Sequence, residues 1–301
     1  MHDAAAMRRF SLHLLAPLLL LGPPLPAAAQ QATDTAAAVD TADRAAATPR
    51  FPPPPSTLGG AARHVVLGFS SDLWANVTAP LRMDGEEALA VGAGLGAVAL
   101  IAVFDDDIQR AVVRHREDDV PRAIEDVGEF VEPVALMGNT NVYYAGGMVL
   151  AYVTGQDELR HVFEELLYSH WIASLTRKGI GRTVGRLRPH EAPDDPFARD
   201  FWAGTSFPSG HSSTATQVAA VLAHHIDWWP ADAALYALAG TVVYHRVATG
   251  KHWASDSVLG ALWGYAVAQI VIARREAERT DFVPFFDPGS GAVGIRVAAP
   301  F

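Results

Sequence analysis

The stretch FPSGHSSTATQVAAVLAHH (207–225) joins a turn signal to an apolar helical run. Pro208 restricts the residue before it and sets the chain for a turn, and Ser209 is a residue type that caps helices. Gly210 lets another group approach the backbone closely. His211 then falls in the first helical turn, where free N–H groups and the helix dipole favour a bound anion such as phosphate. The alternative is that Ser209 and Gly210 only cap the helix and that His211 is structural.

The same helical pattern continues along most of the chain. Long Ala, Leu and Val segments alternate with polar, Gly- or Pro-bearing stretches, and there is little alternation of period two. The sequence therefore predicts an all-α bundle of six helices, at about 85–104, 138–154, 157–178, 211–226, 230–248 and 254–276. Residues 285–301 carry turn signals and a short β-like run, so we expect 278–301 to form a C-terminal tail.

Composition narrows the classes of function. Half of the 301 residues are hydrophobic, so a sizeable core is available. A formal charge of −10 argues against nucleic acid as the main partner. The absence of cysteine excludes disulfides, thiolate metal sites and a cysteine nucleophile. No zinc-binding pattern of the H-E-x-x-H kind occurs, so we expect no metal ligands.

The N-terminus has the layout of a secretory signal peptide. Arg8 and Arg9 precede an apolar run (10–22), and small residues at Ala27 and Ala29 precede Gln30. The alternative is an uncleaved anchor, although the run is shorter than the ~20 residues of a spanning helix. We therefore expect a signal peptide over 1–29 and export to the periplasm or cell envelope.

Residues 30–60 contain few large apolar side chains and a four-proline run. They predict a disordered Ala/Pro-rich tether ahead of a domain over 61–277.

Two of the expected helices raise the question of membrane insertion. The segments 88–104 and 257–273 are uncharged and approach the length of a span. In contrast, the segment 157–178 carries five charged or titratable groups that are unfavourable in a bilayer: Glu158, Arg160, His161, Glu164 and Glu165. Its apolar residues recur on one face, as on an amphipathic helix packed in a water-soluble bundle. The sequence thus favours a soluble exported domain, with an integral inner-membrane protein as the alternative.

A basic run, RKGIGRTVGRLRP (177–189), follows this third helix. It holds five cations and no acid: Arg177, Lys178, Arg182, Arg186 and Arg188. In such an acidic chain, this concentration indicates an anion site. The alternative is a solvated helix end, because Lys and Arg favour the last turn of a helix.

The stretch HRVATGKHWASDSVLG (245–260) places Arg246, His252 and Asp256 in the order R-x5-H-x3-D. If the last helix begins near Trp253, we expect Asp256 to accept a hydrogen bond from one ring nitrogen of His252. That bond would fix the tautomer and leave the other nitrogen as a nucleophile. A His–Asp pair at this spacing also arises by chance.

Together, the three stretches resemble the signature of the type 2 phosphatidic acid phosphatase/haloperoxidase superfamily, K-x6-R-P, P-S-G-H and S-R-x5-H-x3-D. The matches are RP at 188–189, PSGH at 208–211 and R-x5-H-x3-D at 246–256. Gly181 stands where the family has lysine, and His245 where it has serine. We expect the missing lysine contact to come from Arg182 or, failing that, from Lys178 one helical turn earlier.

The resemblance implies a fold of the acid phosphatase/vanadium haloperoxidase type and a metal-independent phosphatase acting on soluble or lipid phosphate monoesters, or on pyrophosphates. His252 would form a phosphohistidine, Asp256 would orient it, and His211 would protonate the leaving oxygen and then activate water. The phosphoryl oxygens would be held by four groups: Arg188, Arg246, Ser209 and the Gly210 N–H. No cofactor is implied, and the partner is a phosphate ester.

Two other functions fit the same residues. A vanadate-dependent haloperoxidase would use this constellation to hold vanadate, which mimics the phosphoryl transition state. A catalytically silent envelope protein would keep the scaffold for binding, and the departures at Gly181 and His245 suggest it.

Overall fold

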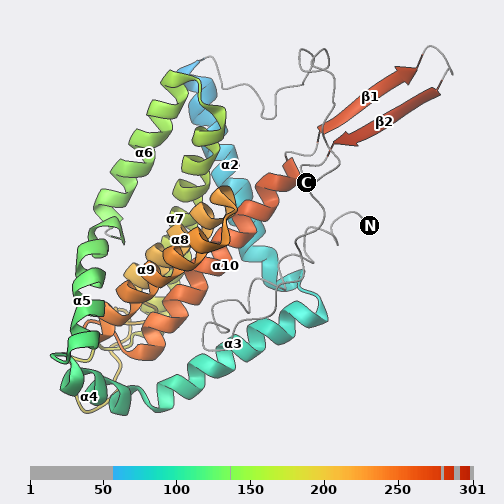
Figure 1. Cartoon of the computed structure of the whole chain (residues 1–301). Coiled ribbons are helices and arrows are strands. Elements are labelled where there is room, and N and C mark those ends of the chain that lie inside the picture. Colours follow the sequence, from blue (N-terminus) through green and yellow to red (C-terminus); the bar gives the residue numbers. More distant parts are fainter. Residues whose placement is uncertain (1–56, 136, 279–280, 288–291, 299–301) are drawn as a thin grey trace, which may run out of the picture.

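The computed structural model describes residues 57–135, 137–278, 281–287 and 292–298. The expected signal peptide and nearly all of the expected tether lie outside these ranges. The described residues form nine α-helices, two short 3-10 turns and one β-hairpin (Figure 1). In order these are α2 (Leu58–Thr78), η3 (Ala79–Leu81), α3 (Gly85–Val103), α4 (Asp105–His115), α5 (Asp119–Val131), η4 (Glu132–Ala135), α6 (Met137–Thr154), α7 (Asp157–Val184), α8 (Gly210–Ile226), α9 (Trp229–Ala248), α10 (Ala254–Glu278), β1 (Asp281–Asp287) and β2 (Ala292–Ala298).

The predicted all-α class is confirmed, and the six expected helices are α3 and α6 to α10. Three helices were missed, namely α2, α4 and α5. The polar residues of α4 and α5 hid them, because both helices carry charges along much of their length. In the C-terminal tail, the single β-like run is one half of an antiparallel hairpin in which Asp281 pairs with Ala298 and Asp287 with Ala292.

Helix α7 is longer than the sequence predicted. It continues to Val184 and ends on Gly185, whose φ of 62° places it in the left-handed region that glycine favours. The basic residues Arg177, Lys178 and Arg182 therefore lie on helical turns, not in a loop.

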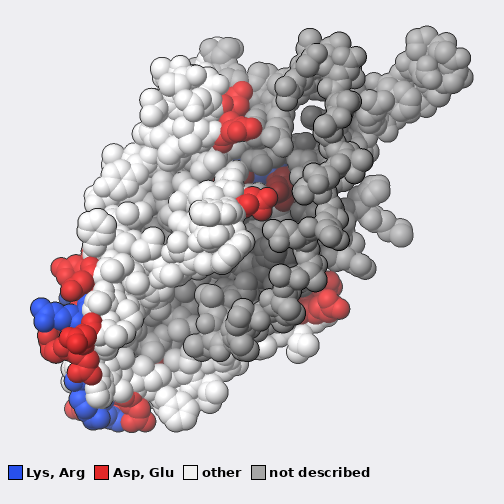
Figure 2. Space-filling view, in the orientation of Figure 1, with Lys and Arg blue, Asp and Glu red and all other residues white. Residues whose placement is uncertain are grey.

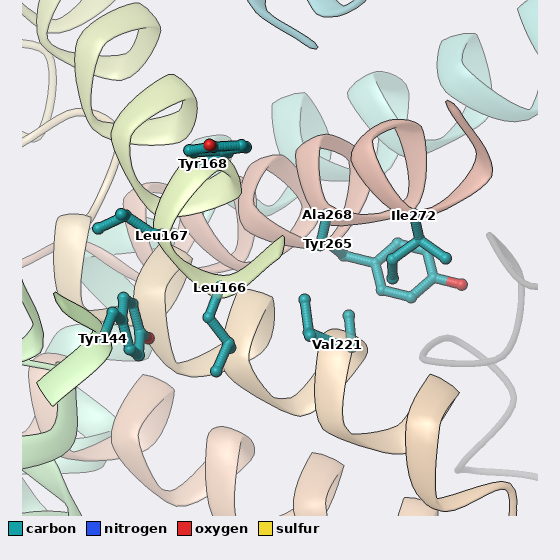
Figure 3. Packing of buried hydrophobic residues seen from close by; sticks show 9 residues of the cluster. Tyr144, Leu166, Leu167, Tyr168, Val221, Tyr265, Ala268 and Ile272 are labelled. Atoms are coloured by element: carbon teal, nitrogen blue, oxygen red, sulfur yellow. The ribbon is translucent and has the colours of Figure 1, made fainter. Parts of the chain in front are cut away.

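The main hydrophobic core lies where α6, α7, α8 and α10 meet. Figure 3 shows the cluster, to which α7 contributes three consecutive residues, Leu166 to Tyr168. Val221 of α8 and Ala268 of α10 are fully buried beside it. This core aligns the two helices whose N-terminal ends carry the second and third motifs.

Close contact between α8 and α10 depends on two glycines one helical turn apart. A Cβ atom on Gly260 would lie 2.3 Å from the carbonyl oxygen of Ser209, and one on Gly264 would lie 2.0 Å from that of Ser213. The Ser209 N–H also donates to the Asp256 carbonyl at 2.9 Å. The start of α8 is thereby fixed against the start of α10.

Four of the five charged or titratable groups noted in the first half of α7 do not face water, and Glu158 alone among them is exposed. Arg160, His161, Glu164 and Glu165 are all buried. Buried charges require partners. Arg160 donates to Glu164 at 2.8 Å, and Arg275 of α10 lies 3.0 Å from the other oxygen of Glu164. These charges join α7 to α10 inside the bundle.

Large apolar side chains are instead exposed on the outer helices. They include Leu67 and Trp74 on α2, Leu89 and Leu100 on α3, and Val153 on α6. Figure 2 shows that charged side chains gather near α4 and α5, while the visible surface along α6 is almost uncharged.

Two described helices, Gly85–Val103 and Ala254–Ala277, are long and apolar enough to cross a membrane by length and composition. Only 11% of the α3 window is buried, against 50% for α10. Helix α10 is thus partly a core helix, whereas α3 presents most of its apolar surface outward.

The glycine contact between α8 and α10 is testable. We expect Gly264→Ala to lower the unfolding free energy by about 1–3 kcal/mol, because the added methyl meets a backbone carbonyl that cannot move freely. The matched control is Gly240→Ala in α9, which has nothing within 4 Å of the added atom and should be neutral or stabilising. Thermal denaturation of the purified variants measures both, and equal melting temperatures would contradict this packing.

Candidate active site

The three motifs converge at one end of the bundle. Arg188 follows α7, His211 lies in the first turn of α8, Arg246 in the last turn of α9, and His252 just before α10. The positive charges of Arg188 and Arg246 both act on the pKa of His252 and on that of His211. The four groups predicted from separate loops are therefore neighbours.

His252 is buried, with 3% of its surface exposed. Its Nδ1 lies 2.7 Å from the carbonyl oxygen of Ser206. A carbonyl only accepts, so Nδ1 carries the proton and the Nε2 lone pair is free. Burial lowers the pKa of His252 well below its ordinary value, and the charges of Arg188 and Arg246 lower it further. The imidazole is neutral at pH 7.

The expected hydrogen bond between Asp256 and His252 was wrong. The carboxylate of Asp256 accepts from Arg186 at 2.7 Å, from the Trp253 N–H at 3.1 Å and from the Ser206 hydroxyl. Ser206 therefore links the two residues, because its hydroxyl binds Asp256 and its carbonyl binds His252. Sequence reasoning missed Ser206, since no motif includes it.

Arg186 is a buried structural cation. Its guanidinium donates to Asp105, Asp256 and the Ser255 hydroxyl, each at 2.7 Å. Both carboxylates are fully buried. This member of the basic run is thus engaged with the protein itself, and Asp105 at the start of α4 was not recognised in the sequence.

The structure explains the glycine in place of the family lysine. A Cβ atom on Gly181 would lie 2.6 Å from the Phe207 carbonyl, so α7 packs against the backbone that leads into the second motif. Arg177 lies one turn earlier on the same face of α7. Its guanidinium donates to the Pro208 carbonyl at 3.3 Å and lies 3.0 Å from where a Gly210 Cβ would be. Burial and the charge of Arg188 lower the pKa of Arg177.

The two residues expected to replace that lysine are placed differently. Lys178 and Arg182 are exposed on the outer surface of α7. Arg177, which belongs to the basic run but was not selected from it, is the cation beside the PSGH segment. A helical spacing of four residues from Gly181 is the signal that could have identified it.

Ser209 and Gly210 occupy the positions predicted for them. Ser209 is the N-cap of α8, and its hydroxyl accepts from the Ser212 N–H at 3.5 Å. The helix begins at Gly210, which places His211 in its first turn. Burial and the charge of Arg246 lower the pKa of His211 to about 4, although nearby Glu132 acts in the opposite direction.

Cations outnumber acids around this point. Arg188 makes no side-chain hydrogen bond or ion pair with another described residue. The Nε of buried Arg246 likewise has no hydrogen-bond partner among them. Glu132 forms an ion pair with Nη1 of the same Arg246 guanidinium. With Arg177, the site holds three guanidinium groups and one carboxylate, which suits a multiply charged anion. Within the described ranges, no group of three His, Asp or Glu side chains is arranged to hold a metal ion.

Comparison with known proteins agrees with the motifs. Two solved structures resemble the chain at 20% sequence identity. LpxE of Aquifex aeolicus has a TM-score of 0.42, covering 55% of this chain and 93% of its own. A transmembrane PAP2 type phosphatidylglycerolphosphate phosphatase from Bacillus subtilis has a TM-score of 0.44, covering 63% and 96%. No curated protein matches the chain. Residues 165–279, which carry all three motifs, match the family model of the PAP2 superfamily.

Proposed function

We propose that the protein is a phosphatase that removes phosphate from lipid phosphate monoesters at a membrane, through a phosphohistidine on His252. The observation that carries this proposal is the group of three guanidiniums around two neutral imidazoles, His211 and His252. Guanidinium groups there supply the positive charge that phosphoryl transfer requires, so we propose that no metal ion takes part.

His252 is the nucleophile in this mechanism. Its Nε2 lone pair attacks phosphorus, and the bond from phosphorus to the leaving oxygen breaks. Because Nδ1 is held on the Ser206 carbonyl, the ring keeps the reactive tautomer throughout. Asp256 acts through Ser206 and is a positioning residue: it holds the hydroxyl of the same residue whose carbonyl holds His252.

His211 is the proton donor to the leaving oxygen. In the free protein its pKa of about 4 leaves it neutral at pH 7. A bound phosphate dianion offsets the nearby arginine charges, which raises this pKa and lets His211 take up a proton. Once it has given that proton away, neutral His211 removes a proton from water, which attacks the phosphohistidine and releases inorganic phosphate.

The phosphoryl oxygens are held by Arg188, Arg246 and Arg177, together with the Gly210 N–H at the start of α8. Arg177, one turn before Gly181 on α7, makes the phosphate contact that the resemblance assigns to the family lysine. Its placement against Pro208 and Gly210 supports this role.

Two surface features support a lipid substrate. A cavity of about 540 Å³ opens between α3 and the segment after α7, and its lining includes Leu95, Phe201 and Phe207. The same cavity reaches Arg186 and Ser255, which are hydrogen-bonded to each other beside Asp256. The apolar outer surface of α3 would also place the site beside a membrane. We therefore propose that the domain lies in or on the cell-envelope membrane.

Loss of either histidine tests the chemistry. We expect His252→Ala to abolish phosphate release from phosphatidic acid in detergent micelles, and His211→Ala to slow it by about 10²–10⁴-fold. Rapid acid-free quenching of the wild type with labelled substrate should trap an acid-labile phosphohistidine that is missing from His252→Ala. Near-normal turnover in either variant contradicts the assignment. Vanadate-dependent halide oxidation without phosphate release would instead favour the haloperoxidase.

The three candidate substitutes for the missing lysine can be separated by binding. We expect Arg177→Gln to weaken tungstate binding about tenfold or more, because it removes a charged hydrogen bond to the oxyanion. Lys178→Gln and Arg182→Gln should bind tungstate like the wild type. Isothermal titration calorimetry measures all three, and a loss confined to Arg182→Gln would restore the expectation from the sequence.

Proton uptake by His211 predicts how binding depends on pH. Dilute, monomeric tungstate stays doubly charged between pH 5 and 8, so changes in its affinity under these conditions report on the protein. Since a bound dianion raises the pKa of His211 from about 4, the bound form holds more protons, and affinity should increase as the pH falls from 8 to 5. We expect His211→Gln to flatten this dependence. An equally flat profile in the wild type would show that His211 takes up no proton.

A further inference from the structure

A carboxylate occupies the middle of the cationic site. Glu132, the first residue of η4, contacts Nη1 of Arg246 through Oε1. The same oxygen lies 3.5 Å from Nε2 of His211, and Oε2 lies 3.3 Å from Nε2 of His245. Glu132 thus touches the proposed proton donor and a proposed phosphate ligand at once. No motif predicted it.

The position of Glu132 is set by backbone packing. Gly128 lies one turn before it on α5, where a Cβ atom would meet the Thr241 carbonyl at 2.5 Å and the His245 Cβ at 2.8 Å. Only a glycine lets α5 approach α9 this closely. That approach carries the end of α5 over the last turn of α9, where Arg246 lies.

The contact conflicts with phosphate binding at the same place. An Arg246 Nη group that donates to a carboxylate oxygen cannot donate in the same direction to a phosphoryl oxygen. A phosphate dianion at hydrogen-bond distance from Arg246 would also lie close to the carboxylate, and like charges at that separation repel each other in this partly buried site. Substrate and Glu132 therefore compete for one guanidinium.

We propose that Glu132 is an internal competitor for the phosphate site, which it occupies in the free protein and from which it helps to expel the phosphate product. This proposal rests on the proposed function of the site. It assigns Glu132 to the reaction cycle as the group that neutralises Arg246 between turnovers. The carboxylate weakens the binding of every oxyanion, including inorganic phosphate.

His245 remains a partner for the Glu132 carboxylate when phosphate displaces it from Arg246. Its Nε2 already faces Oε2 of Glu132, so the side chain keeps one partner when phosphate takes Arg246. His245 stands where the family pattern has serine, and a serine hydroxyl is too short to reach as an imidazole does. The histidine in place of the family serine at position 245 is thus explained by its contact with Glu132.

The test compares Glu132→Gln with the wild type in tungstate binding and in product inhibition by inorganic phosphate. Removing the competing charge should lower the tungstate Kd and the phosphate inhibition constant about tenfold each. The free protein should melt at a lower temperature, because Arg246 loses its counter-ion, and tungstate should raise its melting temperature more than that of the wild type. Glu132→Asp, which keeps the charge but shortens the side chain, should give a smaller change in the same direction.

Two controls separate this proposal from simpler explanations. Glu129→Gln removes the same charge from an exposed position on α5 and should bind tungstate like the wild type. In an Arg246→Gln background, Glu132→Gln should bring no gain, because the contested guanidinium is gone.

Unchanged or weaker tungstate binding in Glu132→Gln, with normal binding in the wild type, would overturn the competitor role alone and leave Glu132 as a structural partner of Arg246. A failure of both proteins to bind tungstate or release phosphate would overturn the proposed function as well.

Discussion

The buried guanidinium of Arg186 holds the active end of the molecule together. It lies between two fully buried carboxylates, Asp105 and Asp256, and also donates to Ser255. A buried charge without a partner is strongly destabilising, so these groups constrain one another to a single arrangement. They belong to the start of α4, the segment after α7 and the start of α10, which are far apart in the sequence. Through Asp256 and Ser206, the same arrangement fixes the ring of His252.

Close backbone packing then brings the remaining groups to this fixed point. Gly260 and Gly264 let α10 touch the start of α8, and Gly181 lets α7 touch Phe207. At each of these glycines a Cβ atom would overlap with the backbone of the neighbouring helix or segment, so none of these positions can carry a cationic side chain. On α7, Gly181 has no side chain, and the guanidinium beside the PSGH segment belongs to Arg177, four residues earlier.

Polar and apolar groups are distributed in an unusual way for a helical bundle. Buried ion pairs join α7 to α10, as in the contact of Glu164 with Arg275, while α3 and α6 expose large aliphatic side chains. In water, a bundle is expected to bury its aliphatic side chains and to expose its charged ones. The proposed lipid surface against α3 would remove this conflict, and the apolar cavity lies beside the buried network of Arg186 and Ser255.

The sequence by itself determined the helical class, the positions of six helices and four of the residues that meet at the site, Arg188, His211, Arg246 and His252. Periodicity and the R-P, P-S-G-H and R-x5-H-x3-D spacings carry that information locally, because caps, turns and helix faces depend on neighbours a few residues away. Only the tertiary structure decided the partners of those residues. The bond of His252 to the Ser206 carbonyl, the position of Arg177 beside Pro208 and the presence of Glu132 at Arg246 all follow from which backbones pack within van der Waals contact. The burial of Arg160, Glu164 and Glu165 on α7 was decided in the same way, since a charged residue looks alike in the sequence whether it faces water or an ion-pair partner.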